Sequence, residues 1–172
     1  SDPVDLAQGA RLVADHADMV PAVVDAGGGS GAFCLALASI CQEITVYENN
    51  PDHFGILQKN VQLLGTDNIT LKQEDIYDGI EEKELDLIHL DLPEPWKVIP
   101  HAEKALKVGG FLAVYLPNLT QVVEFIAATK KSKIHVLETI ELIERKWKIE
   151  ERILRPEFQM LGHTAFLTFC RK

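Results

Sequence analysis

The sequence contains few cysteines and shows no arrangement of side chains that is typical of a metal site. Its three cysteines, Cys34, Cys41 and Cys170, form no C-x-x-C pair, and its six histidines have no metal-ligand spacing. Cys34 and Cys41 lie seven residues apart in a predicted helix, which places both on one face, as core residues are placed. We therefore expect no metal, no disulfide and a reducing, cytoplasmic location.

Long apolar runs, a signal peptide and an excess of basic charge are also absent. Segment 33–40 is too short to cross a bilayer, and residues 1–10 lack the basic and apolar stretches of a secretory signal, so no membrane partner is expected. The net charge of −9 argues against a domain that grips nucleic acid through a broad basic surface. Basic residues do form local clusters, at Lys130, Lys131 and Lys133, at Arg145, Lys146 and Lys148, and at Arg152 and Arg155.

The length fits a single domain spanning residues 1–172, and a first residue of Ser1 rather than methionine leads us to expect a domain of a longer protein. Strands are predicted at Ala22–Asp25, Glu43–Glu48, Ile69–Glu74, Leu85–Leu90 and Phe111–Leu116. Helices are predicted at Asp5–Asp15, Phe33–Cys41, Pro51–Leu64, Val98–Leu106 and Leu119–Thr129. Residues 134–148, 149–154 and 164–170 are strand-rich. We predict an α/β fold with a doubly wound, Rossmann-like sheet, mostly parallel with an antiparallel C-terminal hairpin.

A glycine-rich loop, DAGGGSG from Asp25 to Gly31, follows the first predicted strand and precedes a helix. Glycines are needed where a ligand lies against the backbone, and the helix behind them offers free N–H groups. Two cofactor fingerprints fit this loop. Gly27, Gly29 and Ala32 satisfy the dinucleotide pattern G-x-G-x-x-G/A. Asp25 instead completes D-x-G-x-G-x-G, which favours S-adenosylmethionine.

Two further features favour S-adenosylmethionine. Asp75 ends the third strand, where methyltransferases often place an acidic group near the adenine, and a β-rich C-terminus replaces the second nucleotide-binding half. Glu48, at the end of the second strand, fits both cofactors, because a carboxylate there accepts hydrogen bonds from ribose hydroxyls. We predict a cofactor site formed by Asp25, Gly27, Gly29, Ser30, Gly31, Glu48, Asp75 and Asp91.

The fourth strand leads into a second candidate loop, LDLPEPW from Leu90 to Trp96. Ligands bind at the carboxyl ends of the strands in open α/β sheets, so we expect this loop to face the cofactor. Its two prolines stiffen the backbone, Asp91 contributes a carboxylate and Trp96 contributes a flat apolar surface. Enzymes that methylate amino groups of bases have an N/D-P-P-aromatic motif at this position. The alternative is a proline-rich turn in which Trp96 covers the core.

Taken together, these motifs resemble the tRNA (adenine-N1)-methyltransferase family, class I S-adenosylmethionine-dependent enzymes that modify the T-loop adenosine of tRNA. The resemblance is carried by the glycine loop, by Tyr47-Glu48, by the 90–96 loop, and by R-P-E at 155–157 with G-H-T-A-F-L at 162–167. The segment Y-x-P-N-x-x-Q at 115–121 is also similar. The resemblance implies methyl transfer to N1 of a tRNA adenosine in the region of position 58, with S-adenosylhomocysteine as the second product.

The resemblance also implies roles for individual residues. Asp91 would hold the cofactor's amino group or the N6 amino group of the adenine and offset the developing positive charge, and Tyr115 would act beside the target base. Because N1 carries no proton at neutral pH, no strong general base is needed. The expected substrate-binding residues are Pro93, Trp96, Asn118, Gln121 and Arg155.

Family members are typically homotetramers and carry a β-rich N-terminal domain, which we expect to be absent from this chain. Only the D-P-x-D segment at residues 2–5 resembles the stretch that follows that domain. Three alternatives remain at this point: a methyltransferase that acts on a small molecule, a non-catalytic cofactor-binding partner subunit, and an NAD-dependent oxidoreductase. The intact glycine loop and Asp91 argue against the non-catalytic subunit.

Overall fold

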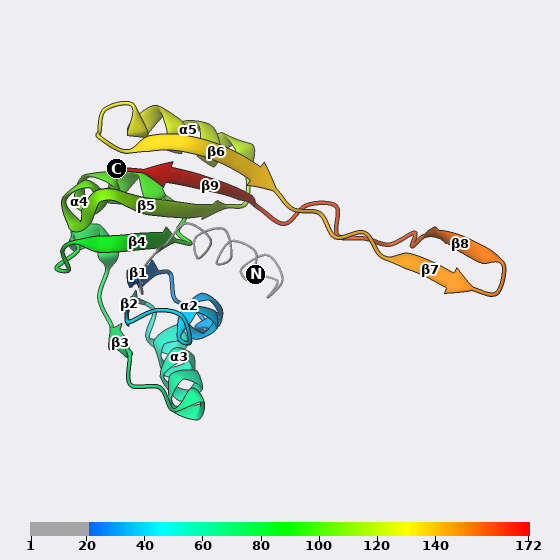
Figure 1. The fold of residues 1–172 in the computed structure, drawn as a ribbon, viewed down its shortest axis with the longest axis horizontal. Coiled ribbons are helices and arrows are strands. Elements are labelled where there is room, and N and C mark those ends of the chain that lie inside the picture. Colours follow the sequence, from blue (N-terminus) through cyan, green and yellow to red (C-terminus); the bar gives the residue numbers. More distant parts are fainter. Residues whose placement is uncertain (1–20) are drawn as a thin grey trace.

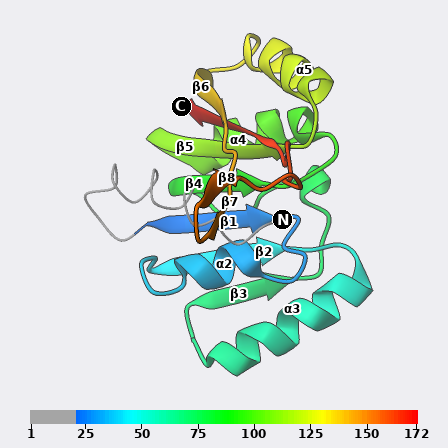
Figure 2. The ribbon, with the colours of Figure 1, turned by 90° about the vertical axis from the view of Figure 1, so that its right-hand side faces the viewer.

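The computed structural model describes residues 21–172, so the predicted helix at 5–15 and the D-P-x-D segment lie outside the described residues. Seven strands form one sheet in the order β3-β2-β1-β4-β5-β9-β6, which Figure 2 shows from bottom to top. These strands are β1 (Ala22–Ala26), β2 (Glu43–Tyr47), β3 (Ile69–Lys72), β4 (Leu85–Leu90), β5 (Leu106–Leu116), β6 (His135–Glu141) and β9 (Phe166–Arg171). The helices are α2 (Ala32–Leu37), α3 (Pro51–Leu64), α4 (Ile99–Ala105) and α5 (Leu119–Thr129), with short 3-10 turns η1 (Ile76–Asp78) and η2 (Pro95–Val98).

The pairing of the strands is that of a doubly wound sheet. β1 pairs in parallel with β2 on one side and with β4 on the other, and β3 and β5 extend the two sides in parallel. β9 then pairs antiparallel with both β5 and β6 (Figure 1). The predicted mostly parallel sheet with an antiparallel C-terminal part is therefore confirmed. The order reverses between β1 and β4, and ligands of such sheets bind at this switch point, beyond the carboxyl ends of the strands.

Each face of the sheet carries its own buried apolar cluster. Phe33 of α2 and Leu57 of α3 pack with Val46 on one face, and Ile99 of α4 and Phe125 of α5 pack on the other. Because successive side chains of a strand point to opposite faces, the buried strands are apolar along most of their length. The buried polar side chains within these strands, Asp25, Thr45, His89 and Thr168, are the exceptions.

Local sequence signals explain where α3 begins and ends. Asn50 caps the helix, since its side chain accepts hydrogen bonds from the amides of Asp52 (2.9 Å) and His53 (3.3 Å), and Pro51 occupies the first turn. Gly65 ends it in the left-handed conformation with φ 69°. The predicted range Pro51–Leu64 is therefore confirmed to the residue. α2, in contrast, ends at Leu37 and not at Cys41.

The prediction for the start of β5 was wrong. The pair Gly109-Gly110 was expected to separate a helix from a strand beginning at Phe111, yet β5 begins at Leu106 and contains both glycines. The register with β4 shifts at this point, and Gly109 has φ 86°. A Cβ on Gly110 would lie 2.8 Å from the carbonyl oxygen of Leu85. The glycines thus form an irregularity within the strand, where the neighbouring backbone comes close.

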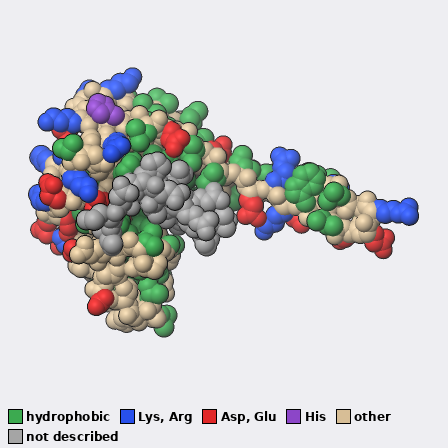
Figure 3. Space-filling model, in the orientation of Figure 1, with side chains coloured by type: hydrophobic (Ala, Val, Ile, Leu, Met, Phe, Trp, Pro, Cys, Tyr) green, Lys and Arg blue, Asp and Glu red, His purple; other side chains and the backbone are tan. Residues whose placement is uncertain are grey.

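A two-stranded arm, residues 143–161, projects from the sheet (Figure 1). Its strands β7 (Trp147–Glu150) and β8 (Ile153–Pro156) pair only with each other, which the sequence did not predict. Hydrophobic side chains gather on its surface (Figure 3), and the most exposed ones are Ile149 (75%), Leu154 (69%), Phe158 (87%) and Leu161 (67%). Within residues 21–172, no helix is long and apolar enough to cross a membrane.

Candidate functional site

Polar side chains from four strands face the same side of the sheet near its carboxyl edge. Asp25 and His89 are register partners on β1 and β4. Side chains two residues apart on a strand face the same way, so Asp91 follows on this face, one step nearer the strand ends. Glu48 and Tyr115 occupy the corresponding positions at the ends of β2 and β5. The fold therefore brings together four residues that the sequence predicted for the site: Asp25, Glu48, Asp91 and Tyr115.

The glycine loop follows a backbone path that excludes side chains. Gly27 has φ 80°, and a Cβ there would lie 2.1 Å from the carbonyl oxygen of Asp91. Gly31, which precedes α2, has φ 89°, and its Cβ would lie 2.7 Å from a methyl carbon of Leu57. The amides of Gly27 and Gly28 both donate to the carbonyl of Tyr47, at 3.1 and 3.3 Å. The loop is thus fixed between the end of β2 and the start of the 90–96 loop.

Glu48 closes the other side of this loop. Its carboxylate is buried and accepts hydrogen bonds from the amides of Gly29 and Asn50, each at 2.8 Å. A carboxylate has about four acceptor positions, so Glu48 can still accept hydrogen bonds from a ligand. This geometry fits the ribose-binding role that the sequence predicted for Glu48.

β3 ends at Lys72 and not at the predicted Glu74, so Asp75 follows the strand by three residues and caps η1, beside the segment that follows β2. Its side chain accepts hydrogen bonds from the amide of Tyr77 (2.9 Å) and from Nδ2 of Asn49 (3.0 Å). Asn49 directly follows Glu48, so this contact holds the ends of β2 and β3 together. Asp75 thus lies beside Asn49, the residue next to Glu48.

A small pocket lies beneath the glycine loop and is walled by Asp25, His89, Asp91 and Phe33. His89 Nδ1 lies 2.8 Å from Asp25 Oδ1, and the His89 ring stacks on Phe33 with centroids 3.9 Å apart. The side chains of His89 and Asp25 are almost fully buried. Asp25 Oδ2 and His89 Nε2 have no hydrogen-bond partner within the described part of the chain.

Burial has the largest effect on the Asp91 carboxyl and raises its pKa above the ordinary value. His89 opposes this rise, and the nearby Asp25 carboxylate adds to it. A cation next to Asp91 would lower this pKa. S-adenosylmethionine carries two cationic groups, an ammonium and a sulfonium, and needs a close backbone approach at its methionine end. The glycine loop, the unpartnered Oδ2 of Asp25 and the Asp91 carboxylate fit that ligand.

The 90–96 loop is held from two sides. Nε2 of Gln121 donates to the carbonyl of Pro93 (2.9 Å), and the hydroxyl of Tyr77 accepts a hydrogen bond from the amide of Glu94 (3.1 Å). Asn118 caps α5 by accepting from the amide of Gln121 (2.9 Å). Asn118 and Gln121, which were predicted to contact substrate, thus have hydrogen-bond partners within the protein. Gln121 holds the 90–96 loop, and Asn118 holds the start of the helix that carries Gln121.

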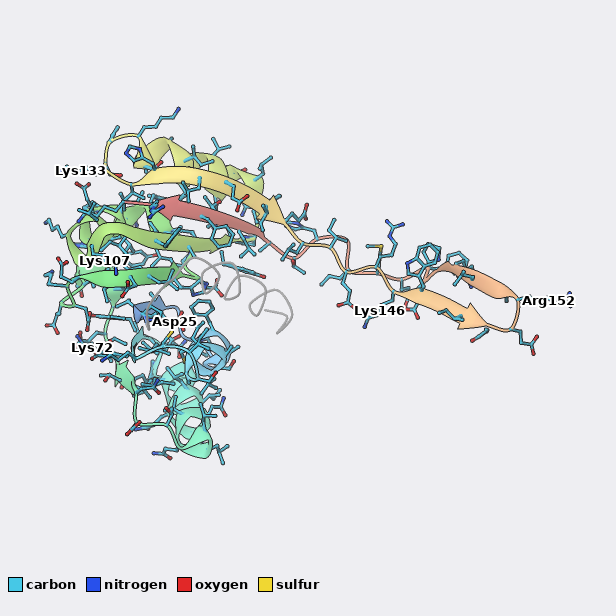
Figure 4. The ribbon with its side chains drawn as sticks, viewed as in Figure 1. Asp25, Lys72, Lys107, Lys133, Lys146 and Arg152 are labelled. Carbon is cyan, nitrogen blue, oxygen red and sulfur yellow. The ribbon has the colours of Figure 1, made fainter. Side chains whose placement is uncertain are left out.

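The remaining predicted substrate residues lie in different surroundings. Pro93 is exposed, and Trp96 is half-buried against the apolar cluster of α4 and α5. Arg155 is on the arm, where its guanidinium lies over the Phe158 ring, 3.9 Å from the centroid. Figure 4 shows the arm, with Arg152 at its tip, well away from Asp25. Arg155 therefore does not join the pocket of this chain.

Sequence reasoning missed His89 and Tyr77. The signal for His89 was an ionisable residue two positions before Asp91, in a strand whose other polar residue is Asp86. Its pairing with Asp25 depends on the register between β1 and β4 and cannot be read from one strand alone. Tyr77 gave no comparable signal, because its partner is a backbone amide in a separate loop.

The sheet order, with a glycine loop at its switch point, defines the Rossmann-like fold of class I S-adenosylmethionine-dependent methyltransferases. Comparison with protein families identifies the family within this class. Residues 18–155 match the family described as tRNA methyltransferase complex GCD14 subunit. The chain belongs to this family, as its sequence motifs predicted.

Individual relatives agree with this assignment. The chain is 36% identical over 162 residues to tRNA (adenine(58)-N(1))-methyltransferase TrmI of Thermus thermophilus, covering 90% of this chain and 64% of that protein. The crystal structure of the tRNA (m1A58) methyltransferase TrmI of Aquifex aeolicus superposes with a TM-score of 0.86 and 25% identity, covering 100% of this chain and 69% of the other. A S-adenosylmethionine-dependent O-methyltransferase of Thermotoga maritima gives a TM-score of 0.84 and 30% identity, covering 96% and 64%. The chain thus spans slightly less than two thirds of the curated TrmI relative.

Proposed function

We propose that the protein transfers a methyl group from S-adenosylmethionine to N1 of an adenosine in the T loop of tRNA, in the region of position 58. The observation that carries this proposal is the similarity over 90% of the chain to an enzyme named for that reaction. The position of Asp91 supports it, since this carboxylate lies beside the glycine loop at the switch point of the sheet.

The cofactor would be held along the carboxyl edge of β1 to β4. Gly27, Gly29, Ser30 and Gly31 form the cradle, Glu48 accepts hydrogen bonds from the ribose hydroxyls, and Asp75 approaches the adenine. Asp25 and Asp91 face the methionine end. When bound, S-adenosylmethionine supplies a methyl group on a sulfonium that needs no activation by the protein. No step requires a metal.

Catalysis would rest on position and charge. Adenine N1 has a free lone pair, so the protein's task is to align it with the methyl group and to stabilise the cationic product. Asp91 accepts a hydrogen bond from the N6 amino group, and its negative charge offsets the charge that develops on the ring. Tyr115, opposite Asp91 at the end of β5, bounds the space for the base. Since N1 lies on the Watson–Crick edge, the adenosine must be unpaired or extruded.

The substrate would meet the protein on two surfaces. Pro93 and Trp96 present the 90–96 loop to the base, while Gln121 and Asn118 act through their hold on that loop. Arg155 would contact tRNA phosphate from the arm, and in an oligomer this contact can be made to tRNA bound at a neighbouring subunit.

The arm would supply the interface of a homo-oligomer, which we propose to be a tetramer. The arm exposes several large apolar side chains, and exposed apolar patches mark interaction surfaces. We further propose that residues 1–172 form one catalytic domain and that the enzyme acts in the cytoplasm.

A tRNA methylation assay tests the proposal. The full-length protein is incubated with labelled S-adenosylmethionine and with unmodified tRNA, and the nucleosides of a complete digest are separated. We expect labelled 1-methyladenosine, and replacing the T-loop adenosine by guanosine should abolish it. Cofactor binding without any labelled nucleoside would overturn the tRNA substrate and leave a small-molecule substrate or a non-catalytic subunit.

A further inference from the structure

The buried pair of His89 and Asp25 has unused hydrogen-bonding capacity. Oδ1 of Asp25 pairs with Nδ1 of His89, while Oδ2 of Asp25 and Nε2 of His89 have no partner among the described residues. Leaving a buried polar atom without a hydrogen-bond partner destabilises the folded protein. Two such atoms in the wall of one pocket indicate that a ligand completes the hydrogen bonding.

The chemistry of the pair defines what this ligand must offer. A carboxylate only accepts hydrogen bonds, so Nδ1 of His89 carries the proton that is shared with Asp25. When Nδ1 carries the only ring proton, Nε2 is an acceptor, and the Asp25 contact and the stack on Phe33 hold the ring in place. The nearby thiol of Cys34 donates to the carbonyl of Gly31 and offers nothing to the pair.

Among residues 21–172, the charged groups around His89 are Asp25 on β1 and Asp91 at the end of β4, and both are carboxylates. With His89 neutral, these three side chains offer hydrogen-bond acceptors and negative charge to the pocket. Its match is a small cation with several N–H donors. The α-ammonium group of the cofactor's methionine moiety has three such donors and carries the required charge.

We infer that His89 is a cofactor-binding residue whose Nε2 accepts a hydrogen bond from the α-ammonium group of S-adenosylmethionine, with Asp25 fixing the ring for this contact. The inference rests on the proposed function, since it concerns the same cofactor site. A purely structural His89 would only satisfy Asp25 and pack on Phe33. The two roles use different ring nitrogens, so they can be separated by substitution.

His89→Asn and His89→Gln form a matched pair for the test. The asparagine amide can replace Nδ1 as the donor to Asp25 but has no group at the position of Nε2, whereas glutamine reaches the position of Nε2. His135→Asn on exposed β6, at the opposite edge of the sheet, is the control. The affinities of the full chain for S-adenosylhomocysteine and for its analogue without the α-amino group are measured by calorimetry.

We expect wild type and His135→Asn to bind S-adenosylhomocysteine at least tenfold more tightly than the deaminated analogue. In His89→Asn this preference should shrink at least fivefold, with unchanged affinity for the analogue, and His89→Gln should retain more of it. An unchanged preference in His89→Asn, or an equal loss for both ligands, would overturn the role of His89. If wild type binds neither ligand, the proposed cofactor itself is wrong, which is a distinguishable result.

A second measurement needs no variant and therefore does not depend on folding of the substituted chains. In wild-type protein with ¹⁵N-labelled histidine, the His89 Nε2 resonance should shift when S-adenosylhomocysteine binds and should stay in place with the deaminated analogue. Equal shifts with both ligands would also overturn the proposal.

Discussion

The ring of His163 joins the segment before β9 to the loop after β5, because its Nε2 lies 2.7 Å from the carbonyl oxygen of Pro117. Its Nδ1 is hydrogen-bonded to the carboxylate of Glu141 at the end of β6. Both partners are acceptors, so the protonated ring, in which both nitrogens donate, satisfies both contacts. Glu141 first, and then the Pro117 carbonyl, raise the pKa of His163.

This clamp predicts a pH-dependent part of the stability. With a raised pKa in the folded protein, the contribution of His163 is complete below the pKa of the unfolded chain and is lost as pH rises through the folded-state pKa. Wild type should therefore exceed His163→Gln in thermal midpoint at pH 6, and the difference should shrink toward pH 9. Because the pair is exposed, added salt should reduce the effect. A difference that stays constant across this range would contradict the charged ring.

Asp91→Asn should stabilise the cofactor-free protein and impair its function. Burial raises the pKa of Asp91, so the protonated form favours the fold and this contribution is lost as pH rises through the raised pKa. At pH 7.5 the ionised carboxylate is therefore a cost, which asparagine removes. A gain of about 1 kcal/mol would raise the melting temperature by roughly 2–4 °C in a domain of this size.

The same variant should lose methyl transfer by about 10²-fold or more, as expected when a group that stabilises developing charge is removed. Melting curves without cofactor and single-turnover methylation rates provide the two readouts. If Asp91→Asn melts lower than wild type, or methylates at the same rate, this reading of Asp91 fails.

Gly27→Ala and Gly55→Ala should have opposite effects. A Cβ at Gly27 would meet the Asp91 carbonyl at 2.1 Å in a left-handed backbone, so the loop must move, at a cost of about 1–3 kcal/mol and with loss of cofactor affinity. Gly55 lies within α3 with no atom within 4 Å of its Cβ position, and alanine there should stabilise by about 0.5–1 kcal/mol. Denaturant unfolding and cofactor titration of both variants check this contrast.

Replacing apolar residues of the arm should change the assembly and leave the fold intact. Phe158 and Ile149 are 87% and 75% exposed on the arm, and Leu63 on α3 is equally prominent at 85%. We expect Phe158→Ser with Ile149→Ser to lower the mass measured by analytical ultracentrifugation, whereas Leu63→Ser should not change it. Equal masses for all three proteins would exclude the arm as the interface.

The sequence was sufficient for the features that depend on local signals. α3 was predicted to its last residue because Asn50, Pro51 and Gly65 each fix one end of the helix. The acidic positions near the ends of β1, β2 and β4 could be predicted because Asp25 lies at the end of an apolar run and Glu48 and Asp91 directly follow their strands. Features that depend on contacts between distant segments could not be predicted. These include the irregularity at Gly109 and Gly110, the separate arm, and the partners of His89 and Gln121.

The position of β9 has a consequence for how the chain folds during synthesis. β6 leaves the ribosome well before β9. Within the described sheet β6 pairs only with β9, so it has no strand to pair with until β9 has been synthesised. β1 to β5 can form a parallel sheet earlier, with the open edge of β5 exposed. A nascent chain that stalls before Phe166 would therefore present two unpaired strand edges, at β5 and β6, to chaperones or to other chains.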